Sequence, residues 1–120
     1  APRKDYAAAA AAVLASGDAG AVHELVGDVA FTMAEFAAEV SRQAGKAIAY
    51  QDMPQADYAA MLESVGLPDF VANMIADSSF QASKDMLFDD SHSLSRLIGR
   101  PTTPIADSIS AALAQVEAAG

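Results

Sequence analysis

The sequence has 120 residues, which fits one domain with a modest core, because a chain of this size buries roughly two thirds of its unfolded surface. The formal net charge of −9 argues against nucleic acid and anionic membrane surfaces as partners, since both need clustered Lys and Arg. The absence of cysteine excludes disulfides, thiolate nucleophiles and cysteine-ligated metals, and it fits a cytoplasmic protein.

The first predicted element is an Ala-rich helix over residues 4–16 that ends near Gly17. Ala is the strongest helix former, and a face of Ala lets another element approach closely. We expect this helix to lie against a neighbour; an exposed helix of high propensity is the alternative. The cluster GDAG at residues 17–20 follows a helix rather than a strand, so it indicates a helix stop and not a phosphate-binding loop. No signal peptide is predicted, because the Ala-rich run at residues 7–15 is barely hydrophobic and follows RKDY. No membrane span is predicted, because no run of about 18 strongly apolar residues occurs.

Two short strands flank the next predicted helix. Residues 21–26 (AVHELV) and 46–51 (KAIAYQ) are the strand candidates. Between them, Thr32 and Glu35 form a T-x-x-E capping box that opens a helix, and Gly45 ends it. Strand, helix and strand in this order predict a small βαβ unit with parallel strands. Two strands alone make a marginal sheet, so they are expected to extend a larger assembly.

Helices dominate the second half of the sequence. Pro54 and Pro68 are each suited to the first turn of a helix. A short helix is predicted over residues 91–98, with Asp90 or Ser91 as its N-cap and Gly99 at its C-terminal end. Thr103 is expected to cap the last helix. The predicted fold class is therefore α/β but mostly helical, with five to six helices and two short parallel strands.

Motifs that would indicate chemistry are missing from the sequence. It contains no G-x-G-x-x-G, no P-loop and no G-x-S-x-G, and no Tyr-x-x-x-Lys pair. His23 and His92 are far apart, and DDSH at residues 89–92 is more typical of a helix start than of a metal site. We predict no catalytic, cofactor-binding or metal-binding residue in this chain.

Methionine and phenylalanine gather in the second half of the chain. Met adapts to irregular apolar shapes, so such residues can line a pocket for a flat apolar ligand. The alternative is ordinary core packing, which their spacing alone favours. We predict Met53, Phe70 and Met74 as substrate-binding residues. Arg3 is a further candidate, for which a surface salt bridge is the alternative.

Four segments in the same order carry a family resemblance. They are RKDYAAAAAAVL, VHELVGDVAFTMAEFAAEVSRQAGKAIAYQDMP, DYAAMLESVGLPDFVANMIADS and LIGRPTTPIADSI, and the resemblance that they carry extends over roughly residues 3–113. The sequence resembles the C-terminal portion of NmrA-like atypical short-chain dehydrogenases, and within that group the bacterial NAD(P)H:quinone oxidoreductases.

This resemblance implies a C-terminal, substrate-side lobe over residues 1–120 of a Rossmann-type protein. In that family the N-terminal half carries the Gly-rich dinucleotide loop, and that half is missing here. NAD(P)H would therefore belong to the full-length parent and not bind this portion alone. The implied reaction is hydride transfer from NAD(P)H to a quinone, with this portion inactive by itself. The missing Rossmann domain is the implied partner, and the apolar face it would cover predicts self-association.

Two other functions remain open at the level of sequence. NmrA-like proteins include redox-sensing regulators, which bind dinucleotide and protein partners without turnover. A stand-alone helical interaction module is the third possibility.

Overall fold

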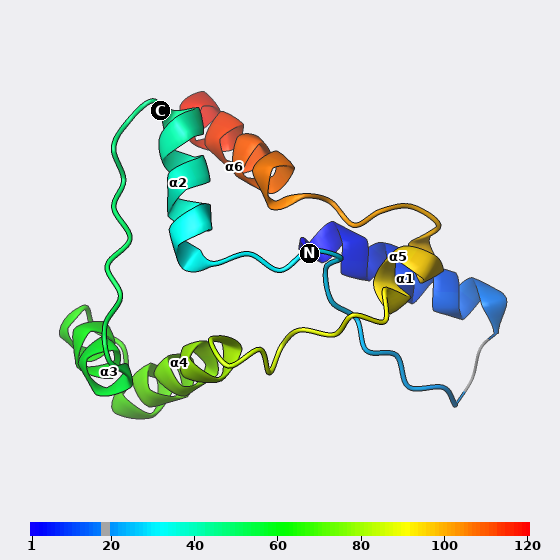
Figure 1. The fold of residues 1–120 in the computed structure, drawn as a ribbon, viewed down its shortest axis with the longest axis horizontal. Helices are drawn as coiled ribbons and strands as arrows, with labels where there is room; N and C mark the ends of the chain where they lie inside the picture. Colours follow the sequence, from blue (N-terminus) through cyan, green and yellow to red (C-terminus); the bar gives the residue numbers. More distant parts are fainter. Residues whose placement is uncertain (18–19) are drawn as a thin grey trace. The chain divides into compact units, whose positions relative to one another are not determined.

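The computed structural model describes residues 1–17 and 20–120. Within these residues it contains six helices, which are α1 (Arg3–Ser16), α2 (Met33–Ala44), α3 (Gln55–Ser64), α4 (Asp69–Ala82), α5 (Ser93–Ile98) and α6 (Ile105–Ala119) (Figure 1). The chain forms two compact units. The first comprises Ala1–Tyr50 and Asp89–Gly120, and the second comprises Gln51–Phe88. The prediction of a mostly helical fold is confirmed.

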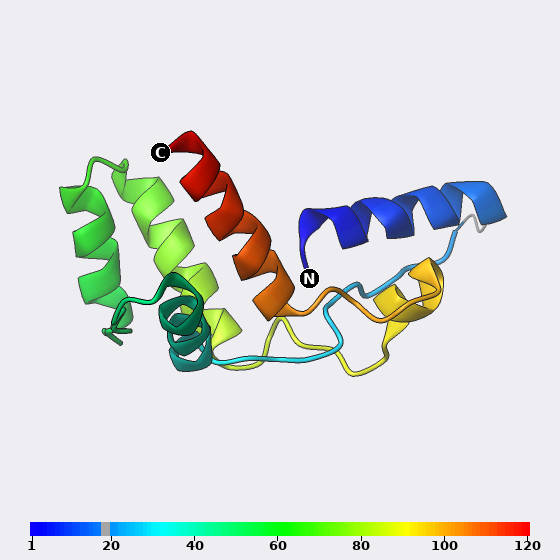
Figure 2. The ribbon, with the colours of Figure 1, turned by 90° about the horizontal axis from the view of Figure 1, so that it is seen from above.

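In the first unit, α1 packs against α5 and α2 packs against α6. Figure 2 shows α5 beside the Ala-rich helix α1. Ala9 of α1 and Leu94 of α5 are fully buried. The Ala-rich helix therefore does lie against a neighbour, and Gly17 ends it in the left-handed conformation, with φ +67°. Two residues of the GDAG cluster, Asp18 and Ala19, lie outside the described residues.

Helix α2 begins and ends where its sequence predicts. The Thr32 hydroxyl accepts a hydrogen bond from the Glu35 N–H at 3.1 Å, and the Thr32 N–H donates to the Glu35 carboxylate at 2.9 Å. This reciprocal pair is the predicted capping box. At the other end of the helix, the Gln43 side chain donates to the Ala106 carbonyl at 2.9 Å and so ties α2 to α6.

The two predicted strands are absent from the described residues, so the predicted βαβ unit was wrong. Residues 21–26 and 46–51 are irregular. A strand is stable only where a neighbouring strand accepts and donates its backbone hydrogen bonds, and neither segment has such a neighbour within residues 1–17 and 20–120. At Ile48, in the second of these segments, a side chain replaces the backbone partner. The Ser41 hydroxyl accepts from the Ile48 N–H at 2.9 Å and lies 3.0 Å from the Ile48 carbonyl oxygen.

The second unit is a pair of helices, α3 and α4, which lie side by side in both views (Figures 1 and 2). The hydrophobic residues buried in this unit are all alanines, namely Ala59, Ala72 and Ala76. Their small side chains allow the two helices to approach closely. Pro54 and Pro68 stand one residue before α3 and α4, at the N-cap rather than in the first turn.

The caps of α5 and α6 differ from prediction. Neither Asp90 nor Ser91 is the N-cap of α5; His92 is, in a left-handed conformation with φ 56°. Pro104 rather than Thr103 is the N-cap of α6. The hydroxyl of Thr103 does not cap α6 because it donates to a residue far away in sequence, described below. Gly99 ends α5 as predicted, with φ +69°.

Within residues 1–17 and 20–120, no helix combines the length and the apolar character needed to cross a bilayer.

Replacing a buried alanine of the α3–α4 pair with a larger residue should separate the helices. We expect Ala72→Leu to lower the free energy of unfolding by about 1 to 3 kcal/mol, because the side chain is fully buried and has no room to expand. Ala60→Leu, at an exposed position of α3, is the matched control and should change it by less than about 0.5 kcal/mol. Urea unfolding followed by circular dichroism measures both. Equal effects of the two variants would contradict close packing at Ala72.

Candidate functional site

Asp5 is fully buried and holds the segment between α5 and α6. One carboxylate oxygen accepts hydrogen bonds from the Arg100 guanidinium at 2.8 Å and the Thr103 hydroxyl at 2.9 Å. The other oxygen accepts from the Thr103 backbone N–H at 2.7 Å. A residue in the first turn of α1 therefore fixes a segment almost one hundred positions further along the chain.

The electrostatics of Asp5 follow from these contacts. Burial disfavours the charged carboxylate, but the hydrogen bonds from Thr103 and the charge and hydrogen bond of Arg100 outweigh it, so the pKa of Asp5 lies below its usual range. Asp5 is thus a buried, ionised anchor.

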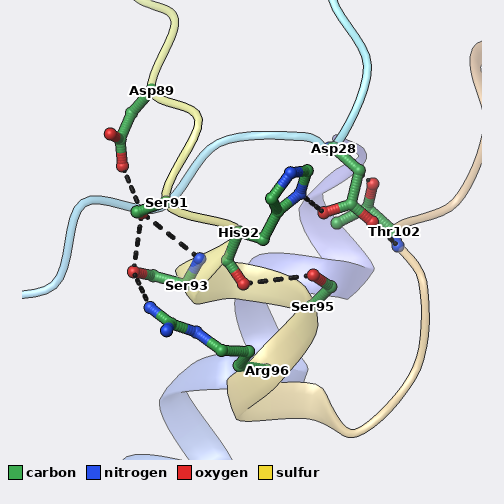
Figure 3. A network of polar contacts seen from close by, with 8 residues as sticks. All are labelled: Asp28, Asp89, Ser91, His92, Ser93, Ser95, Arg96 and Thr102. Atoms are coloured by element: carbon green, nitrogen blue, oxygen red, sulfur yellow. Dashed lines mark hydrogen bonds and ion pairs between the residues drawn. The ribbon is translucent and has the colours of Figure 1, made fainter.

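Asp28 holds the same segment from the other side. Its carboxylate accepts a hydrogen bond from the Thr102 N–H at 2.9 Å, and its own N–H donates to the Thr102 hydroxyl at 2.9 Å. The second carboxylate oxygen lies 3.0 Å from Nδ1 of His92. Figure 3 shows the Asp28 carboxylate between the His92 ring and Thr102. The Thr102 N–H, with further hydrogen bonds from His92 and Ser95, holds the pKa of the Asp28 carboxyl well below its usual range.

A hollow of about 470 Å³ lies beside these contacts, within the first unit. Three short stretches line it: residues 1–2, residues 27–31, and positions between 101 and 108. Its apolar walls include Val29, Phe31 and Ile105, and the Phe31 ring also stacks on Phe36 with ring centroids 6.2 Å apart. Thr102 and Thr103, which the two carboxylates fix in place, are part of the wall.

The lining of this hollow combines apolar side chains with a few polar groups. The one titratable side chain that we find in its lining is Asp28, whose carboxylate already accepts hydrogen bonds from Thr102 and His92. Apolar walls with a few fixed polar groups are typical of sites for small, largely apolar ligands. Among the described residues, no cluster of three His, Asp or Glu side chains could hold a metal ion.

The four substrate-binding residues predicted from the sequence lie elsewhere. Arg3 is exposed at the start of α1 in the first unit. Met53, Phe70 and Met74 belong to the second unit. Phe70 and Met74 are one turn apart on α4, with exposed fractions of 73% and 59%, whereas Met53 is half-buried. None of the four lines the hollow in the first unit, and their contact with a substrate stays a prediction.

Sequence reasoning missed the residues that build the hollow. Asp5, Asp28 and Thr102 lie 64 to 98 positions from their hydrogen-bond partners, so no local pattern reveals these contacts. One signal was available in RPTT at residues 100–103. This segment holds two hydroxyl groups and a guanidinium outside any predicted helix interior, and such groups need acceptors when they are buried.

Comparison with known proteins adds a specific relative. No family model matches the sequence. Over 111 residues, or 92% of this chain, the sequence is 56% identical to quinone oxidoreductase 2 of Escherichia coli strain K12. The crystal structure of an NADPH-dependent quinone oxidoreductase from Escherichia coli is similar to this chain with a TM-score of 0.86 and 53% identity over 94% of this chain. A crystal structure of that enzyme in complex with NADPH gives the same TM-score and identity.

The similarity covers only part of each relative. This chain spans 39% of the curated protein and 42% and 40% of the two crystallised chains. The resemblance to a bacterial quinone oxidoreductase that the sequence indicated is confirmed over nearly the whole of this chain.

Removing the charge of Asp5 should destabilise the first unit. We expect Asp5→Asn to lower the free energy of unfolding by about 2 to 4 kcal/mol, because the amide cannot accept all three bonds and leaves buried donors without a partner. Asp90→Asn removes the same charge at an exposed position and should cost less than about 0.5 kcal/mol. Urea unfolding measures both. A loss below about 1 kcal/mol for Asp5→Asn would contradict the anchoring role.

The lowered carboxylate pKa values predict acid sensitivity. A group whose pKa is lower in the folded state stabilises the fold above its unfolded pKa, and that stability is lost as the pH falls through its folded pKa. Asp5 and Asp28 are such groups, and Arg42 and Gln43 lower the pKa of Glu39 to about 2. We therefore expect the melting temperature to fall between about pH 5 and pH 2.

The matched variant for this experiment is Asp28→Asn. It should melt at a lower temperature than the unmodified protein at neutral pH and lose less of its melting temperature on acidification. Thermal scans at a series of pH values test this. Parallel curves for the two proteins would show that Asp28 does not contribute to the acid sensitivity.

Proposed function

We propose that residues 1–120 serve as the C-terminal, substrate-side lobe of an NAD(P)H-dependent quinone oxidoreductase. The observation that carries this proposal is the 56% identity over 111 residues to quinone oxidoreductase 2. The match to a crystal structure of an NADPH complex supports NAD(P)H as the cofactor of the whole protein.

The hollow in the first unit supports the quinone part of the proposal. A quinone is a flat, largely apolar ring with two carbonyl oxygens. Phe31, Val29 and Ile105 supply apolar walls, and Ser108, whose side chain carries a hydroxyl that can donate a hydrogen bond, is also part of the lining. We place the quinone ring in this hollow. The predicted residues Met53, Phe70, Met74 and Arg3 form a second proposed contact set, which the exposure of Phe70 and Met74 supports.

This chain itself does not fit the cofactor. A dinucleotide pyrophosphate is held by a Gly-rich turn between a strand and a helix, and residues 1–17 and 20–120 contain no strand. NAD(P)H would supply the hydride when the whole protein binds it. The contribution of this chain is to bind and orient the quinone and to exclude water, and we expect the 120-residue chain alone to be inactive.

Exposed apolar side chains support two partner proposals. Phe70, Met74, Val65 and Met86 are each more than half exposed. In the whole protein, we propose that a Rossmann domain covers such residues, and the isolated chain is then expected to self-associate.

The acidic charge supports neither nucleic acid nor an anionic membrane as a partner. A cysteine-free composition is compatible with the cytoplasm as the location of the protein.

The direct test is turnover by the full-length protein. With NADPH and a soluble benzoquinone, we expect oxidation of NADPH at 340 nm in proportion to quinone reduced. Dinucleotide binding without turnover would reject the enzyme and favour a redox-sensing regulator, which is the alternative that the family resemblance leaves open.

Two Phe substitutions locate the substrate. We expect Phe31→Ala in the full-length protein to raise the apparent KM for quinone roughly fivefold, because it removes apolar contact from the hollow. Phe70→Ala tests the second contact set, and Val116→Ala, at an exposed position of α6, is the control. A raised KM for Phe70→Ala together with an unchanged KM for Phe31→Ala would move the quinone to the second unit.

A further inference from the structure

His92 occupies an unusual place at the start of α5. It is a non-glycine residue with φ 56°, a left-handed conformation that costs free energy and persists only where surrounding contacts hold it. Its side chain remains 55% exposed, so the imidazole is open to solvent protons. Its Nδ1 lies 3.0 Å from the Asp28 carboxylate (Figure 3).

Asp28 connects His92 to the hollow. One carboxylate oxygen faces His92 and the other accepts from the Thr102 N–H, while the Asp28 N–H donates to the Thr102 hydroxyl. Asp28 and Thr102 both line the hollow, whereas His92 does not. The imidazole therefore lies outside the hollow and is connected to its wall through the carboxylate of Asp28.

We propose that His92 is a positioning residue: it holds Asp28, and through Asp28 it holds Thr102 at the wall of the hollow, so that the charge on its imidazole adjusts how tightly the hollow binds its ligand. That this ligand is a quinone rests on the proposed function. Nδ1 must carry a proton to donate to a carboxylate. The neutral ring can do so in one tautomer, but the protonated ring makes a stronger, charge-assisted bond.

The surrounding charges favour this role for His92. Three other charged side chains near it contact different groups: Asp89 accepts from Ser91, Arg96 donates to Ser93, and Arg100 donates to Asp5. The second imidazole, that of His23, lies with Ser93, Arg96 and Leu97 around a separate hollow. Asp90 is the adjacent exposed acid. Of the charged side chains in residues 1–17 and 20–120, the His92 imidazole is the one that we find paired with Asp28. Imidazole is also the side chain that ordinarily changes charge between about pH 5 and pH 8.

The test uses two substitutions in the full-length protein. His92→Gly removes the imidazole but suits the left-handed backbone, so it separates loss of the side chain from backbone strain. His92→Gln keeps an N–H donor that does not titrate. Asp90→Asn is the control for a change of charge nearby.

The first readout is the pH profile of quinone reduction. We expect the apparent KM for quinone of the unmodified protein to rise roughly two- to fivefold between about pH 5.5 and pH 8, as expected for a partly exposed ion pair. His92→Gly should show the raised KM at every pH, and His92→Gln should show a KM that does not change with pH. kcat should be unchanged by either substitution, because His92 does not reach the hollow. The same pH profile in His92→Gln as in the unmodified protein would overturn the proposal.

The second readout does not depend on turnover. Amide hydrogen exchange at the Thr102 N–H, compared at one pH, should be faster in His92→Gly than in the unmodified protein and unchanged in Asp90→Asn. Unchanged exchange in His92→Gly would overturn the positioning role. Absence of quinone reduction by the unmodified protein would overturn the proposed function and the quinone as ligand, while the exchange experiment would still decide whether His92 holds Thr102.

Discussion

The first unit depends on two carboxylates that hold one short segment. Asp5, from α1, binds Arg100 and Thr103, and Asp28, from the segment before α2, binds Thr102. Consecutive residues of the segment between α5 and α6 are thus fixed from two directions. This segment leads directly into α6, which packs on α2, so the two carboxylates hold the chain immediately before that helix pair.

These polar contacts matter more here than they would in a protein with a large core. Of the six buried hydrophobic residues described, four are alanines, which contribute little burial energy; only Leu94 and Ile109 are large. Many bulky apolar side chains, among them Phe70, Met74 and Leu87, are exposed instead. An apolar surface of this kind is unusual on an isolated domain and typical of a surface that another part of a protein covers. This fits the finding that the chain spans about two fifths of its relatives' length.

The parts of the fold that the sequence predicted are those set by neighbouring residues. The Thr32–Glu35 capping box and the left-handed glycines Gly45 and Gly99 depend on residues at most a few positions away, and the structure confirms them. The strands failed because a strand needs a partner that alternation alone does not identify. The hollow and its carboxylates were not predicted: Asp5 and Asp28 have ordinary surroundings in sequence, and their partners are 64 to 98 positions away. Of the residues that the Met and Phe pattern identified as candidates, Phe70 and Met74 are exposed and Met53 is half-buried, and none of them lines the hollow.

At Thr103, the local preference for capping a helix is overridden by hydrogen bonds to Asp5. As the residue before Pro104 it was the natural cap for α6, and a Thr cap contributes about 1 kcal/mol to a helix. In the structure its hydroxyl and its N–H both donate to Asp5, and α6 begins without a side-chain cap. The hydrogen bonds that Thr103 donates to the buried, charged carboxylate of Asp5 are stronger than the hydrogen bond of a helix cap. Forming them in place of the cap therefore stabilises the folded unit as a whole. It also fixes the backbone of Thr103, next to Thr102, at the wall of the hollow. The same hydrogen bonds that stabilise the unit therefore determine the shape of its proposed binding site, and a change that weakens one should alter the other.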